Sequence, residues 1–118
     1  MRAKDAVGAY GEKVAARHLQ DAGCVLLDRN WRCSEGELDL VAADGDVLVI
    51  CEVKTRSSLA YGDPAEAVVG VKAARIRRLA VRWMAAHDSR WPEVRFDVIT
   101  VLRRPRGAAA VRHLRGAF

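Results

Sequence analysis

The strongest constraint on the fold is a predicted hairpin in residues 36–57, which read GELDLVAADGDVLVICEVKTRS. Asp44-Gly45 lies between two largely apolar runs and favours a type I′ turn, which needs positive φ at both central residues. With these two residues at the centre of the turn, Ala43 faces Asp46. The sequence therefore predicts two antiparallel strands joined by a tight turn.

The register of this hairpin decides which charged residues share a face of the sheet. With that turn, Glu37 lies opposite Glu52, and Asp39 lies diagonal to Glu52 at roughly 7–8 Å between backbones. A slip of one residue would move Asp39 and Glu52 to opposite faces, so the prediction depends on the turn. Four charged residues then share one face: Glu37, Asp39, Glu52 and Lys54.

The second strand of the hairpin carries charge at the end of an apolar run. Residues 47–51, VLVIC, are typical of a central strand covered on both faces. Glu52 and Lys54 follow directly, and buried charges are costly unless they are paired or bind a metal. One interpretation is an ion pair of Lys54 with Glu52 or Asp39 at a sheet edge. The other is a site for Mg²⁺ or Mn²⁺, because three acids on one face repel one another unless a cation lies among them.

An acid on one strand followed by E-x-K at the end of the next resembles the PD-(D/E)xK nuclease superfamily. Nearly the whole chain is similar to a small bacterial family, the YraN-like family UPF0102, through five segments: GAYGEKVAARHL, GELDLVA, CEVKTRS, YGDPAEAV and RHLRGAF. This series of segments is far more specific than the E-x-K triplet. Leu38 stands where the superfamily's name has proline before Asp39, a position that is loosely kept.

The expected elements favour an α/β fold in a single nuclease-like domain over residues 1–118. Their order suits a mixed central sheet flanked by helices, and the resemblance implies the restriction-endonuclease-like arrangement. Gly23 is expected to end the first helix, and Asp63-Pro64-Ala65-Glu66 reads as a helix start. The other expected ranges are helices near 5–21 and 71–86, a short strand at 24–27, a strand at 95–102 and a last one near 110–114.

The charge balance favours a polyanionic partner such as nucleic acid. The net charge is +5 with a pI of about 9.6, although such charge could also serve only solubility. Arg56 and Ser57, next to the acid cluster, are suited to phosphate contacts but are equally ordinary loop residues. Lys72 projects from the apolar side of its helix, where it could snorkel or point at the same cleft as Lys54. A stripe at helical spacing is a candidate phosphate contact or an ordinary solvated face: Arg75, Arg78 and Arg82.

The cysteines and the hydropathy indicate a cytoplasmic protein with no membrane contact. Cys24, Cys33 and Cys51 are odd in number and lack a C-x-x-C spacing, so reduced thiols in the cytosol are the simplest interpretation. The N-terminus has no apolar signal region, and no apolar stretch is long enough to span a membrane.

The resemblance implies a Mg²⁺- or Mn²⁺-dependent DNA endonuclease, a phosphodiesterase acting on branched or otherwise structured DNA. Asp39 and Glu52 would hold the metal together with the carbonyl of Val53. Glu12, in a G-E context on the first helix, would complete the site, although from the residues alone it is an ordinary surface glutamate. Lys54 would orient or deprotonate the attacking water. Glu37 is expected next to these ligands, as an acid that does not itself bind the metal.

Two other functions remain open from the sequence. One is a non-catalytic nucleic-acid-binding module with the same fold, although acids beside phosphates repel DNA unless metal is bound. The other is a protein-interaction adaptor whose acid cluster is an ion-pair network. A homodimer or another protein partner is left open as well.

Overall fold

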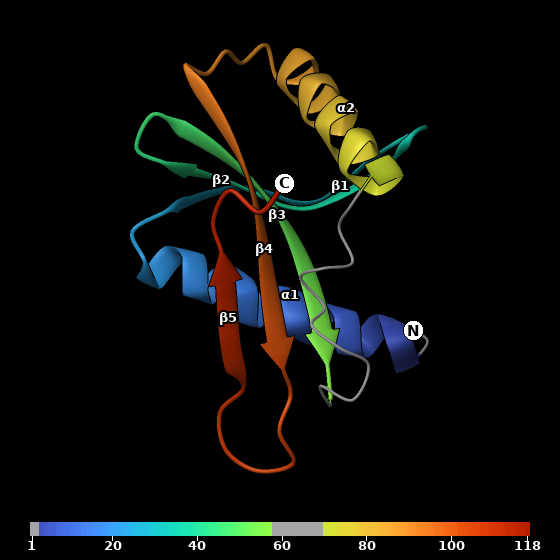
Figure 1. Ribbon diagram of the computed structural model, residues 1–118, viewed down its shortest axis with the longest axis vertical. Coiled ribbons are helices and arrows are strands. Elements are labelled where there is room, and N and C mark those ends of the chain that lie inside the picture. Colours follow the sequence, from blue (N-terminus) through green and yellow to red (C-terminus); the bar gives the residue numbers. More distant parts are fainter. Residues whose placement is uncertain (1–2, 58–69) are drawn as a thin grey trace.

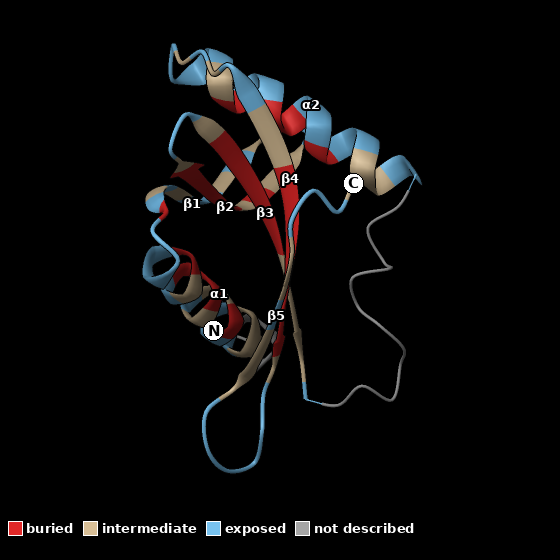
Figure 2. Cartoon of the chain, turned by 60° about the vertical axis from the view of Figure 1, so that its left-hand side comes forward, coloured by how far each residue is buried: buried red, intermediate tan, exposed pale blue. Residues whose placement is uncertain are grey.

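In the computed structural model, a five-stranded mixed sheet has one helix on each face (Figures 1 and 2). The structure describes residues 3–57 and 70–118. The strands lie in chain order; β3 and β4 are parallel, and the other neighbours are antiparallel. The elements are α1 (Ala3–Asp21), β1 (Val25–Cys33), β2 (Gly36–Asp44), β3 (Val47–Arg56), α2 (Gly70–Ala86), β4 (Glu93–Leu102) and β5 (Ala110–Leu114).

This architecture confirms the predicted α/β class with a mixed sheet flanked by helices, as in the restriction-endonuclease-like arrangement. The parallel pair β3–β4 needs a long crossover, and α2 lies within it. The helix start expected at residues 63–66 lies outside the described residues.

Strand β3 is covered on both faces, as its continuous apolar run predicts. Leu48 and Ile50 pack in the core layer under α2, while Val49 and Cys51 pack in the layer under α1. All four are buried because successive side chains of a strand point to opposite faces. Glu52 and Lys54 therefore lie on the central strand of the sheet, just after its buried part.

Helix α1 ends as predicted, but β1 is longer than predicted. Gly23 has φ 95°, and Cys24 N–H donates to Leu19 O at 2.9 Å, which is a Schellman ending. The short strand expected at 24–27 is wrong, since pairing continues through Trp31 opposite Leu38. Charged residues are tolerated here because β1 is an edge strand, open to solvent on one side.

The predicted hairpin register is wrong by two residues. Asp44 pairs with Val47, so the loop consists of Gly45 and Asp46 rather than Asp44 and Gly45. Of the loop residues, only Gly45 has positive φ, at 61°, which fits a type II′ turn and spares an aspartate from that conformation. Asp44 stays in the strand, where its Oδ2 accepts a hydrogen bond from Arg95 Nη1 at 3.1 Å.

A shift of two residues preserves side-chain parity, so Asp39, Glu52 and Lys54 keep the common face that the sequence predicts, whereas Glu37 lies beyond the point where β2 changes face. The ladder reaches Leu40 opposite Cys51, and there it is replaced by a side-chain contact. Asp39 Oδ2 accepts the Val53 N–H at 2.9 Å. In the observed register, Asp39 is the residue next to Leu40 and would lie opposite Glu52, whereas the predicted register placed it diagonal to Glu52.

Strand β2 changes face at Asp39. Leu38 belongs to the core layer under α2, and Leu40 belongs to the layer under α1. Residues two apart would share a face of a straight strand, so β2 must twist or bend between them. This bend places Asp39 between the two layers, where residues from both helices can approach it.

Gly11 brings α1 against β3. A Cβ on Gly11 would overlap Thr55 Oγ1 and lie 2.8 Å from Thr55 Cβ. The absence of a side chain therefore fixes how closely the helix approaches the strand, one residue before Glu12.

We expect Gly11→Ala to destabilise the protein by about 1–3 kcal/mol, because the helix must move away from Thr55. The matched control is Gly8→Ala on the same helix, where a Cβ would meet no atom within 4 Å. That change should stabilise by up to about 1 kcal/mol through helix propensity. Urea unfolding followed by circular dichroism measures both, and equal effects would contradict this role of Gly11.

Candidate metal centre

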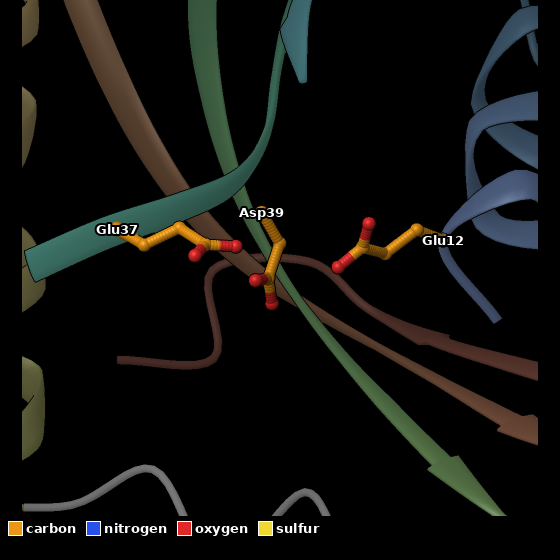
Figure 3. Close-up of side chains that lie close together, drawn as sticks. All are labelled: Glu12, Glu37 and Asp39. Carbon is orange, nitrogen blue, oxygen red and sulfur yellow. The ribbon is translucent and has the colours of Figure 1, made fainter. Parts of the chain in front are cut away.

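Three carboxylates from two elements converge at the bend of β2. Glu12 comes from α1, and Glu37 and Asp39 come from β2. One oxygen of each lies within 4.8 Å of the others, and all three residues are partly buried. Figure 3 shows Asp39 between the other two, with the three side chains pointing toward one another. We call these three residues the acid cluster.

Each member of the acid cluster has its own support. Glu12 follows Gly11, and the nearby side chain of Asn30, an edge-strand residue with φ 50°, works against the rise in the pKa of Glu12. Glu37 Oε2 accepts from Arg32 Nε at 2.9 Å. Asp39 is held by the Val53 N–H. Val53 is therefore connected to the site by its N–H, and a role for its carbonyl stays a prediction.

Glu52 lies beside the acid cluster and is paired with two lysines. Its Oε1 is 3.0 Å from Lys72 Nζ and 3.4 Å from Lys54 Nζ, and its side chain is 11% exposed. Lys72 therefore points at the same cleft as Lys54. The ion pair between Glu52 and Lys54, one of the two interpretations of the sequence, is present. The third carboxylate of the acid cluster is that of Glu37 and not that of Glu52.

The crowding of like charges shifts several pKa values. Burial, reinforced by the neighbouring Glu52 carboxylate, raises the pKa of Asp39 to about 7. Burial also raises the pKa of Glu12, with Glu37 and Glu52 adding to the effect. Burial and the adjacent Lys72 lower the pKa of Lys54. Without a cation, the site therefore disfavours the ionised forms of Asp39 and Glu12.

This crowding predicts that Asp39→Asn stabilises the metal-free protein at pH 8. A carboxyl whose folded pKa is raised contributes stability below about pH 4 that is lost as the pH rises through about 7. Asparagine keeps an acceptor for the Val53 N–H without the charge, so we expect a gain of about 1–2 kcal/mol at pH 8. Thermal unfolding with EDTA measures it, beside the exposed loop variant Asp46→Asn. A gain that does not shrink towards pH 4 would contradict this cause.

The predicted nucleic-acid-binding residues lie on two different parts of the molecule. Arg56 and Ser57 lie at the end of β3, where Arg56 Nη1 donates to Thr55 O at 3.0 Å. On α2, Arg75 and Arg78 are exposed, whereas Arg82 Nη1 lies 3.3 Å from Glu35 Oε1. The α2 stripe is thus partly neutralised at its C-terminal end.

The residues present fit a hard divalent cation. The acid cluster offers oxygen donors from an independent helix and strand, which is the ligand type that Mg²⁺ and Mn²⁺ prefer. A cation there would relieve the repulsion that raises the pKa values of Asp39 and Glu12. Cys51, the nearest soft donor on β3, is buried in the layer under α1 and is not part of the cluster.

Three supporting features of the site were missed from the sequence. Nothing in the sequence identifies Asn30 as a neighbour of Glu12 or Arg32 as the partner of Glu37. A glycine inside a helical pattern costs about 1 kcal/mol relative to alanine, so Gly11 was an unusual residue there and did carry a signal.

The fold and the site define an α/β protein with a mixed sheet and an acid cluster. Two lysines, Lys54 and Lys72, pair with Glu52 beside this cluster. The family model described as "Uncharacterised protein family UPF0102" matches residues 11–101. The chain therefore belongs to the UPF0102 family.

Similar proteins carry the same family description. A UPF0102 protein of Beutenbergia cavernae is 64% identical over 116 residues, covering 98% of this chain and 98% of the relative. One from Frankia casuarinae is 64% identical over the full length of both chains, 118 residues. One from Nocardia farcinica is 50% identical over 98% of this chain and 91% of its own.

Two further sequence expectations concern the thiols and the membrane. Cys24, Cys33 and Cys51 are all free thiols. In the described part of the chain, neither helix combines the length and the apolarity needed to cross a membrane.

Proposed function

We propose that this protein is a Mg²⁺- or Mn²⁺-dependent DNA endonuclease that hydrolyses phosphodiester bonds. The observation that carries the proposal is the convergence of Glu12, Glu37 and Asp39 beside Lys54. Carboxylates that lie close together in a partly buried site repel one another, and such an arrangement is expected where a cation binds between them. The resemblance to PD-(D/E)xK nucleases agrees with this chemistry.

In this proposal each residue of the site has a defined task. Asp39 and Glu12 hold the metal, with Glu37 or Glu52 as the further carboxylate. A bound metal would act as a Lewis acid that stabilises negative charge on the phosphate, and it would lower the pKa of the water that it binds. Lys54 orients the attacking water and accepts its proton, a task that its lowered pKa favours. Lys72 holds Glu52 and faces the incoming phosphate.

DNA is the proposed substrate because the chain is basic and arginines lie near the site. The net charge is +5, and Arg56 follows Lys54 on the same strand. Branched or otherwise structured DNA is proposed on the resemblance to resolvase-like enzymes.

A non-catalytic nucleic-acid-binding module is the second candidate. The double pairing of Glu52 with Lys54 and Lys72 favours it, because such an ion-pair network can be stable without metal. The raised pKa of Asp39 argues against it, since a module that needs no metal gains nothing from a crowded carboxylate.

Cleavage of a labelled DNA panel with Mg²⁺ or Mn²⁺ tests the proposal. The panel comprises a single strand, a duplex, a flap, a splayed fork and a four-way junction. We expect metal-dependent cutting of at least one substrate, and EDTA should abolish it. Tight binding of uncut DNA would favour the second candidate instead.

A further inference from the structure

A pocket beside the acid cluster opens towards the end of β3. It has a volume of about 430 Å³, and its polar lining comprises Glu12, Lys54, Thr55 and Arg56. It connects the acid cluster and its lysine with the first arginine beyond them. A strand of DNA whose phosphate lies at the acid cluster therefore has space to continue here.

A second, smaller pocket continues past the end of the sheet. Its volume is about 280 Å³, and Ser57, Arg103 and Arg104 line it. The segments that line the two pockets lie side by side, because Arg103 N–H donates to Arg56 O at 2.7 Å. Figure 2 shows the connection between β4 and β5 as an exposed segment that projects beyond the sheet.

The two pockets bring arginines together from two separate segments. Arg56 comes from the end of β3, and Arg103 and Arg104 begin the β4–β5 connection. Arg103 lies over the Tyr10 ring at 5.6 Å from its centroid, a cation–π contact that limits where its guanidinium can go. Among the described residues that line the two pockets, Glu12 is the only acid. We call Arg56, Arg103 and Arg104 the arginine track.

We propose that the arginine track binds the phosphodiester backbone of the DNA strand that leaves the acid cluster. The strand then runs along the N-terminal half of α1 and the end of β3, rather than over α2. Guanidinium groups suit this task because they bind phosphate with two parallel hydrogen bonds. The α2 stripe is less suited, because Glu35 already pairs with Arg82. This inference rests on the proposed function for its substrate.

The test compares two double variants that lose the same charge. Arg103→Ala/Arg104→Ala removes two members of the arginine track. Arg90→Ala/Arg115→Ala removes two exposed arginines at the opposite end of the sheet, before β4 and after β5. The probe is a fluorescein-labelled DNA single strand, and binding is followed by fluorescence anisotropy with EDTA over a range of salt concentrations.

We expect Arg103→Ala/Arg104→Ala to raise Kd about tenfold and to reduce the salt slope by about 1.4, at roughly 0.7 for each lost phosphate contact. The control pair should change Kd by less than about twofold, because arginines that neutralise no phosphate release no counterions from the strand. Equal effects of the two pairs would overturn the inference, and so would failure of the wild type to bind the strand.

Cleavage separates this inference from the proposed function. With a cut substrate, the track variant should raise KM and leave kcat within about twofold, because the track binds DNA away from the reacting phosphate. A fall in kcat with unchanged KM would contradict it. Track-dependent binding by a wild type that cuts no member of the panel would support the arginine track and refute the nuclease.

Discussion

Asp39→Asn should reduce metal-dependent DNA cleavage by at least about 10²–10³-fold, the scale on which single electrostatic groups of an active site act. The variant keeps an acceptor for the Val53 N–H, so the bend of β2 should persist. It lacks the charge that a divalent cation needs at the centre of the acid cluster. Initial rates with Mg²⁺ and with Mn²⁺ measure the loss.

Asp46→Asn is the matched control, because it removes one charge from the exposed loop of the same hairpin. It should cleave at the wild-type rate. Lys54→Met, which keeps the length of the side chain without its amine, should lose activity on the scale of Asp39→Asn. Cutting that survives in Asp39→Asn would indicate another site or a contaminating nuclease.

Asp97→Ala should cause the largest loss of stability, about 3–5 kcal/mol. Asp97 is fully buried and accepts four hydrogen bonds: two from Arg95 at 2.9 and 3.0 Å, one from His113 at 2.7 Å and one from Gly116 N–H at 3.0 Å. Removing the carboxylate leaves these donors without their partner. Urea unfolding measures the loss.

Asp44→Ala is the control for this network, because it removes one hydrogen bond to Arg95 at a partly buried position. It should cost less than about 1 kcal/mol. A loss as large as that of Asp97→Ala would show that the buried carboxylate has no special role.

The same network fixes the sign of an acid-dependent loss of stability. Burial alone would raise the pKa of Asp97, but hydrogen bonds from His113, Arg95 and Gly116 hold it at about 2. A depressed pKa gives stability that is present above about pH 4 and is lost as the pH falls through about 2. This is opposite to Asp39, whose contribution is lost as the pH rises.

The sequence was sufficient for the class of fold and for the face of the hairpin. The run before Glu52 predicted a strand covered on both sides, and the parity of Asp39 and Glu52 survived a register error of two residues. The turn itself was not predictable, because Gly45 can serve as the first central residue as well as the second. Asp44 is retained in the strand by Arg95, a residue far away in the sequence.

The composition of the acid cluster was harder to predict, because it depends on side-chain direction. The bend at Asp39 turns Glu37 inwards, and Lys72 pairs with Glu52 from a separate helix. No local pattern reports either event. The contact between His18 and His113 joins residues 95 positions apart, which single-sequence periodicity cannot detect.

Calorimetric titration with Mn²⁺ tests most directly whether the acid cluster is a metal site. Wild type, Asp39→Asn and Asp46→Asn are compared at pH 6 and pH 8. We predict that wild type binds Mn²⁺ more tightly at pH 8, because the pKa of Asp39 is about 7 and binding must displace its proton. Asp39→Asn should bind at least about tenfold more weakly, with Asp46→Asn unchanged. No binding by wild type, or equal binding by Asp39→Asn, would contradict the metal site.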